Sequence, residues 1–175
     1  MPQIIDNLAD LTAHMDRDDL ESALVQTIKD LLSPLSIEIC RSVGERDDER
    51  WLTCIKQGPD DLVPKTDEGW SNLDELPKLA AFPLRRQAVD CQRVVRQTGS
   101  PSLTVFPLSR NAASRSVLEI TTPSPISEAS ANLLTGVLRL YGNFQNLLDY
   151  GERDTLTELL NRKTFDGAFL KATTK

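Results

Sequence analysis

Three patterns in this sequence predict an α+β fold built on an antiparallel sheet. Apolar residues recur first at helical spacing, then at alternate positions in two pairs of short segments, and finally at helical spacing over residues 127–153. A polar connection joins the two members of each pair, as is typical of antiparallel hairpins. The sequence therefore predicts an antiparallel sheet with helices packed on one face and a long C-terminal helix.

Two helices are expected before the first strand. Residues 1–15 form a short one, and Asp16 is placed to cap a second helix that ends at Ser33-Pro34, because proline cannot continue the hydrogen-bond ladder. The apolar stripe of this second helix consists of Leu20, Leu24, Ile28, Leu31 and Leu32.

The first hairpin is predicted from "SIEICRSV" and "RWLTCIK", which flank a charged turn, and simple alternation places Trp51, Thr53 and Ile55 on one face. The second is predicted from "SLTVFPLS" and "RSVLEITT". Pro107 lacks an amide hydrogen, so its strand is expected to be bulged there or to lie at an edge.

The segment between the hairpins is irregular in its first part. Glycine and proline interrupt residues 58–75, which predicts a loop with room for a short helix or an edge strand. After Pro83 a helix is expected to run to Gly99, and one side of it would carry Leu84, Ala88, Cys91 and Val95.

Ser127 is the natural cap of the long C-terminal helix, which carries two apolar stripes. One stripe is Leu133, Leu140 and Leu147. Together the two stripes cover an apolar arc of the helix that is wide enough for two partners, namely the sheet and a second copy of the helix. The alternative is a single helix buried in the core of a monomer. We expect a homodimer through the other stripe, Leu134, Val137, Tyr141, Phe144 and Leu148.

Composition excludes several classes of function. A net charge of −6 argues against nucleic-acid and membrane-surface binding, since both need a basic surface. With one histidine, His14, and three scattered cysteines, neither a histidine-based metal cluster nor a zinc site is expected, and no catalytic pair is evident. The cysteines are expected to be small core residues. The N-terminus lacks the features of a signal peptide, so a cytoplasmic location is expected.

The segment "DTLTELLNRKTFD" resembles the opening of GGDEF domains, the bacterial diguanylate cyclases. Glu158 stands where that family usually has glycine, and Lys163 conservatively replaces its second basic residue. The matching residues of this opening motif are Asp154, Leu156, Thr157, Leu159, Asn161, Arg162 and Phe165.

This resemblance implies a full-length protein that joins two GTP molecules into cyclic di-GMP. The family's Gly-Gly-Asp/Glu-Glu-Phe loop and its metal-binding carboxylates do not occur in residues 1–175. We therefore expect that this chain carries no catalytic or metal-binding residue of that reaction, and that GTP and Mg²⁺ belong to a downstream domain. Residues 154–175 would be the truncated start of that domain.

The order of elements over residues 16–126 resembles a GAF domain, a sensory module, with residues 127–153 as the connecting helix. The "VFPLS" and "RSVLEI" pair carries the resemblance, with Ser116 where GAF domains often have glycine. The resemblance leaves the ligand unknown. Trp70, Arg85 and Arg86 are candidate ligand-binding residues, because a loop tryptophan beside arginines can close over an aromatic or anionic ligand. In the alternative interpretation Trp70 packs on the core and both arginines lie on a solvated helix face.

Two functions remain open at this stage. The chain is either a regulatory input domain, which transmits ligand binding or dimer rearrangement through the helix of residues 127–153, or a passive dimerisation scaffold without a ligand, attached to a degenerate GGDEF domain. A sensor would be stabilised by a ligand, whereas a scaffold would show only concentration-dependent stability.

Overall fold

The computed structural model describes residues 17–45, 47–66, 72–108 and 115–152. Its strands form one antiparallel sheet in the order β3-β2-β1-β6-β5-β4. The predicted α+β class with an antiparallel sheet and a long C-terminal helix is confirmed. In chain order the elements are α2 (Arg17–Leu32), β1 (Ser36–Val43), β2 (Arg50–Gln57), β3 (Lys65–Thr66), η1 (Leu73–Glu75), η2 (Leu79–Ala81), α3 (Pro83–Cys91), β4 (Val95–Gln97), β5 (Ser102–Pro107), β6 (Ser116–Thr122) and α4 (Glu128–Glu152).

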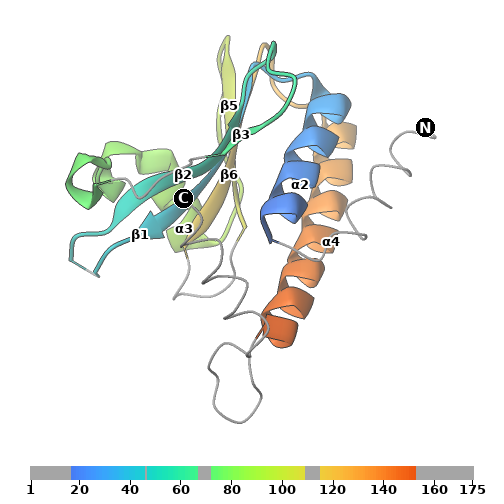
Figure 1. Cartoon of the computed structure of the whole chain (residues 1–175). Helices are drawn as coiled ribbons and strands as arrows, with labels where there is room; N and C mark the ends of the chain where they lie inside the picture. Colours follow the sequence, from blue (N-terminus) through green and yellow to red (C-terminus); the bar gives the residue numbers. More distant parts are fainter. Residues whose placement is uncertain (1–16, 46, 67–71, 109–114, 153–175) are drawn as a thin grey trace.

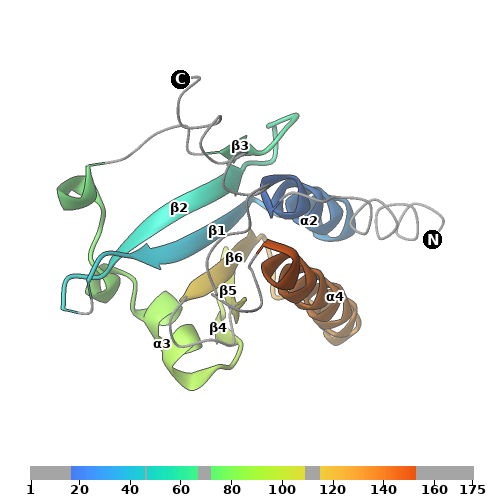
Figure 2. The same cartoon turned by 60° about the horizontal axis from the view of Figure 1, so that its bottom comes forward.

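The two long helices, α2 and α4, lie side by side on one face of the sheet, as predicted, but the short helix α3 covers the opposite face, so the prediction that all helices pack on one face is wrong for α3 (Figures 1 and 2). Each face therefore has its own apolar core. The buried residues of the first core, beneath α2 and α4, are Leu20, Leu24, Val25, Ile28, Ile37, Ile39, Ile55, Phe106, Leu118, Ile120, Leu134, Val137 and Tyr141. Those of the second core, beneath α3, are Cys40, Trp51, Leu79, Ala88, Val89, Val105 and Val117.

A bulge in β2 changes which face its side chains occupy. The pairing runs from Ile39 with Ile55 directly to Cys40 with Thr53, so Cys54 has no partner on β1. An extra residue of this kind resets the alternation of side chains along its strand. Trp51 consequently lies in the second core and Ile55 in the first, and the prediction that they share a face with Thr53 is wrong.

The helix predicted from Pro83 to Gly99 ends early. Gln92 has a φ of +50° and caps α3 in the left-handed conformation, after which Val95–Gln97 forms the edge strand β4. The inward side of α3 carries Arg85, Ala88 and Val89, whereas Cys91 is exposed. The prediction of Cys91 and Val95 on one helical side is therefore wrong. Pro107 is the last residue of β5, two residues beyond the part of that strand that β4 pairs.

The long helix begins as predicted, because the Ser127 Oγ accepts a hydrogen bond of 3.1 Å from the amide of Ser130. The assignment of its two stripes is wrong. Leu134, Val137 and Tyr141 are 0%, 2% and 1% exposed, and Phe144 and Leu148 pack against the same core. The stripe predicted to form the dimer thus belongs to the domain's own interior, because α4 packs on the sheet beside α2.

Several predicted features lie outside the described residues. They are the helix of residues 1–15 with His14, the cap Asp16, the loop residue Trp70 and the GGDEF opening motif from Asp154 to Phe165. In the part of the chain that is described, no helix combines the length and the apolar character that a membrane crossing requires.

Candidate functional site

A buried ionic cluster joins α3 to the centre of the sheet. The side chain of Arg85 is 4% exposed and points from α3 toward β1 and β6. Its Nε donates to Oε2 of Glu119 at 2.8 Å, and its Nη2 donates to Oε1 of Glu119 and to Oε2 of Glu38, each at 2.9 Å. The guanidinium also lies 4.0 Å from the ring centre of Phe82. Arg85 is therefore the only arginine of the predicted pair that is held inside the fold.

The two carboxylates of this cluster face each other across the β1–β6 ladder. Glu38 and Glu119 are direct partners in the register of the two strands, an arrangement in which like charges repel. Arg85 lies between them, and Lys56 of β2 contributes a second cation, 2.7 Å from Oε1 of Glu38. Two positive and two negative groups are thus balanced on the face of the sheet beneath α3.

The electrostatics of Arg85 reflect both burial and pairing. Burial on its own lowers the pKa of a guanidinium, but the hydrogen bonds and charge of Glu119, together with the charge of Glu38, outweigh it and raise the pKa of Arg85. Arg85 accordingly stays charged, and it fastens α3 to the sheet through a bidentate ion pair.

Arg86 lies on the other side of α3, so the structure separates the two predicted ligand-binding arginines. Its side chain is 57% exposed and pairs with Asp90 one turn later. Arg86 and Asp90 line an open surface cavity of about 290 Å³, together with Ala80, Pro83 and Gln87. The expectation of a solvated helix face holds for Arg86 and is wrong for Arg85, because α3 is short and its Arg85 side faces the sheet.

A second polar cluster, built around two buried residues, lies on the opposite face of the sheet. Oε1 of Glu21, on α2, accepts hydrogen bonds from Nη2 of Arg41 on β1 and from the hydroxyl of Tyr141 on α4, the latter at 3.2 Å. Nε2 of Gln145 in turn donates to that hydroxyl. We refer to Glu21, Arg41, Tyr141 and Gln145 as the α2–α4 clasp. Sequence reasoning missed it, although a glutamate within the apolar side of α2 was a visible signal.

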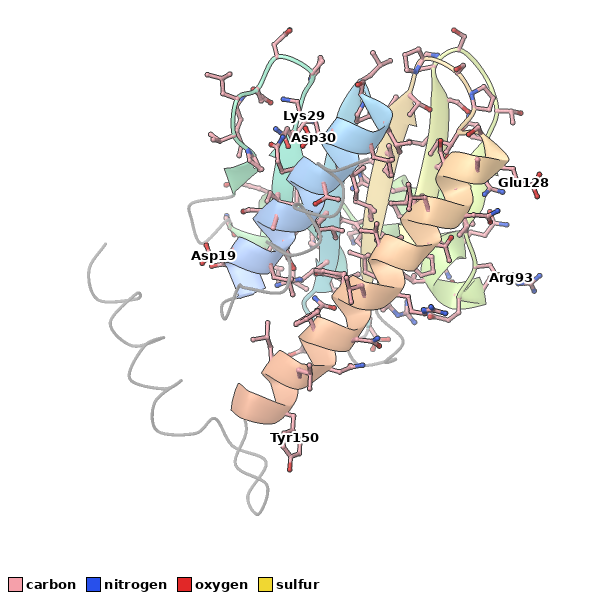
Figure 3. All side chains as sticks on the ribbon, turned by 90° about the vertical axis from the view of Figure 1, so that its right-hand side faces the viewer. Asp19, Lys29, Asp30, Arg93, Glu128 and Tyr150 are labelled. Atoms are coloured by element: carbon pink, nitrogen blue, oxygen red, sulfur yellow. The ribbon has the colours of Figure 1, made fainter. Side chains whose placement is uncertain are left out.

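An apolar seam remains uncovered on α4. Leu133 is 39% exposed and Leu147 is 64% exposed, and Leu140 lies midway between them in sequence at the seven-residue spacing of a coiled-coil seam. Tyr150, 74% exposed, continues it and points away from the domain near the end of α4 (Figure 3). Leu133, Leu140 and Leu147 form the second predicted stripe, and we call them the leucine seam.

The cysteines differ in exposure, and this predicts their order of reaction. Burial raises the pKa of the thiols of Cys40 and Cys54 to about 11, with nearby arginines opposing the shift, whereas Cys91 is exposed. At pH 8 iodoacetamide should alkylate Cys91 first and the other two more than about tenfold more slowly. Mass spectrometry of the time course checks this order, and equal rates in the folded chain would contradict it. Both folded pKa values exceed the reference value of 9.0, so the buried thiols stay protonated where those of the unfolded chain ionise. The free energy of unfolding should therefore fall as the pH rises from about 9 to 11.

No protein-family model and no curated protein matches this chain. Solved structures of similar fold do exist. The GAF domain of an Acinetobacter phosphoenolpyruvate-protein phosphotransferase superposes with a TM-score of 0.56 at 13% identity, over 80% of this chain and 88% of that one.

Two further structures agree with the first. A GAF domain/HD domain protein from Geobacter sulfurreducens gives a TM-score of 0.54 at 10% identity, over 75% of this chain and 93% of that one. The GAF domain of a two-component sensor histidine kinase from Bacillus halodurans gives 0.52 at 15% identity, over 79% and 99%. The ionic cluster, the clasp and the leucine seam are thus carried by a chain that has the fold of a GAF domain.

Proposed function

We propose that this chain is the regulatory input domain of a diguanylate cyclase and that α4 carries its output. The observation that supports this most directly is the position of α4, whose last turns extend past the sheet (Figure 3). The helix ends at Glu152, two residues before Asp154, where the GGDEF opening motif begins. The GAF fold supports a sensory role, since similar folds occur in a sensor histidine kinase and in phosphotransferases.

The proposal includes a homodimer, because a cyclase that joins two GTP molecules needs two opposed catalytic domains. The leucine seam is the surface of α4 that suits a second copy: its spacing is that of a coiled-coil seam, and it leads toward the outgoing end of the helix. This replaces the buried stripe through Leu134 and Tyr141 as the proposed contact.

Introducing a charge into the seam tests the dimer. Leu147→Glu should leave the thermal unfolding curve of the domain nearly unchanged, because Leu147 is exposed, and should weaken self-association at least tenfold. Sedimentation velocity across a concentration series measures this, with Asn146→Glu as the neighbouring control of equal charge. Association that is unaffected by Leu147→Glu but lost in Asn146→Glu would place the contact elsewhere.

Cyclase activity is tested on the full-length protein. The coding sequence beyond Lys175 should contain an intact Gly-Gly-Asp/Glu-Glu-Phe loop, and the protein should convert GTP to cyclic di-GMP in the presence of Mg²⁺. In the same assay Leu147→Glu should lower the rate at limiting protein concentration. A stop codon immediately after residue 175, or a complete loop without product formation, would overturn the assignment.

One observation favours the second candidate, a dimerisation scaffold without a ligand attached to a degenerate GGDEF domain. The Arg85 cluster fills part of the contact between α3 and the sheet with the chain's own charges. The two candidates separate in a thermal-shift screen of small cytoplasmic metabolites. A sensor is stabilised by a ligand at fixed protein concentration, whereas a scaffold is stabilised only by a rise in its own concentration.

A further inference from the structure

The α2–α4 clasp lies where α4 leaves the body of the domain. Among the α4 side chains that the structure describes, Tyr141 is the last buried one; the later ones are half-buried or exposed. Residues 142–152 therefore depend on few apolar contacts, chiefly those of Phe144 and Leu148. Their attachment to the domain relies on whatever holds Tyr141 and the next turn in place.

Each member of the clasp comes from a different element or turn. Glu21 belongs to α2 and is 4% exposed, Arg41 belongs to the central strand β1, and Tyr141 and Gln145 belong to successive turns of α4. A single carboxylate oxygen accepts from both Arg41 and Tyr141. The position of the sheet is thereby tied to both helices at one point.

The charges of the clasp make this junction sensitive to any displacement of the groups that donate to Glu21. A buried carboxylate is stable only while its donors remain, because water does not replace them. Burial lowers the pKa of Arg41, but the charge of Glu21 outweighs it and the net direction is upward, so Arg41 stays a cation. Movement of β1 relative to α2 would displace the Arg41–Glu21 ion pair, and through Glu21 it would displace the Tyr141 hydroxyl.

We infer that the clasp is the element that positions the outgoing turns of α4, so that a change in the sheet reaches residues 142–152 through Glu21 and the Tyr141 hydroxyl. The inference rests on the proposed function only in treating α4 as the output. The clasp positions the helix; it takes no part in any reaction.

Hydrogen–deuterium exchange on the 175-residue chain tests the inference, with Tyr141→Phe as the main variant. This change deletes the hydroxyl and keeps the ring that fills the first core. Loss of the hydrogen bond to the buried Glu21, together with the one that the hydroxyl accepts from Gln145, should speed amide exchange in residues 142–152 by about tenfold, with α2, β1 and the first turns of α4 unchanged within twofold. Tyr150→Phe, at an exposed position of the same helix, is the matched control and should change nothing.

Gln145→Ala provides a second variant that cannot unfold the core, because Gln145 is only half-buried. It should produce a smaller rise confined to the same residues. Uniform acceleration across α2, β1 and α4 in Tyr141→Phe would mean that the cluster only stabilises the fold, and no change in residues 142–152 would remove the clasp from the output altogether. Either result is independent of whether a cyclase domain follows, so the proposed function and this inference can fail separately.

Discussion

Arg85→Met should lower the free energy of unfolding by about 3–5 kcal/mol, a large fraction of the stability of an ordinary domain. Methionine keeps most of the volume beneath α3 but removes the cation that lies between Glu38 and Glu119. The two carboxylates would then face each other across neighbouring strands with only Lys56 to balance them. Urea unfolding followed by tryptophan fluorescence and by circular dichroism measures the change.

The neighbouring position supplies the control. Arg86→Met removes an exposed guanidinium that pairs with Asp90 in the same helix, and it should change stability by less than about 0.5 kcal/mol. Adding Glu38→Gln and Glu119→Gln to Arg85→Met should restore much of the loss, because no buried charge then lacks a partner. Equal effects of the two arginine substitutions would mean that the ionic cluster contributes little.

Leu134→Ala should cost about 2–5 kcal/mol, whereas Leu133→Ala should cost less than about 1 kcal/mol. The two leucines are adjacent in sequence, but Leu134 is 0% exposed in the first core and Leu133 is 39% exposed on the leucine seam. The same substitution at neighbouring positions is therefore matched in chemistry and in helix propensity. Urea unfolding at low protein concentration separates the intrinsic stability from any effect of association.

Self-association should show the reverse order for this pair. Leu133→Ala removes part of the seam and should weaken the dimer, while any Leu134→Ala protein that remains folded should associate as the parent does. If Leu133→Ala destabilises the domain as much as Leu134→Ala at low concentration, both stripes are core and the proposed dimer surface does not exist.

Local chemistry allowed the elements to be predicted where their signals lie within a few residues. The Ser127 cap, the Ser33-Pro34 stop and the alternating segments of both hairpins each depend on neighbours in sequence, and the structure contains them. The bulge at Cys54 is different, because it is a property of the pairing between β1 and β2. No particular residue type in either strand signals it. Alternation counted along β2 alone therefore places Ile55 on the wrong face.

The candidate site could be predicted only in part, since its partners are distant in sequence. Arg85 was singled out, but its acceptors lie 47 and 34 residues away, and a single sequence does not reveal such pairs. The α2–α4 clasp could not be predicted for the same reason, because Glu21 and Tyr141 are 120 residues apart. The two stripes of α4 were found, but both are apolar at seven-residue spacing, so periodicity did not decide which one faces the sheet.

The adjacent stripes of α4 restrict the kind of motion that can carry a signal. Successive residues of a helix are about 100° apart, so a turn of that size would exchange the leucine seam with the buried stripe. Leucine would meet comparable leucine at both ends of the helix. In the middle, however, Gly136 would replace Val137 in the core, Leu140 would replace Tyr141 and its hydroxyl, and Asn143 would replace Phe144.

That exchange would leave a cavity at the site of Val137, remove a hydroxyl donor from Glu21 and desolvate the amide of Asn143, and all three changes are unfavourable. Axial rotation of this size is thus opposed by Gly136 and Asn143, which lie beside the leucine seam. A signal that leaves through this helix must travel as a tilt, a displacement along its axis or a loosening of its final turns.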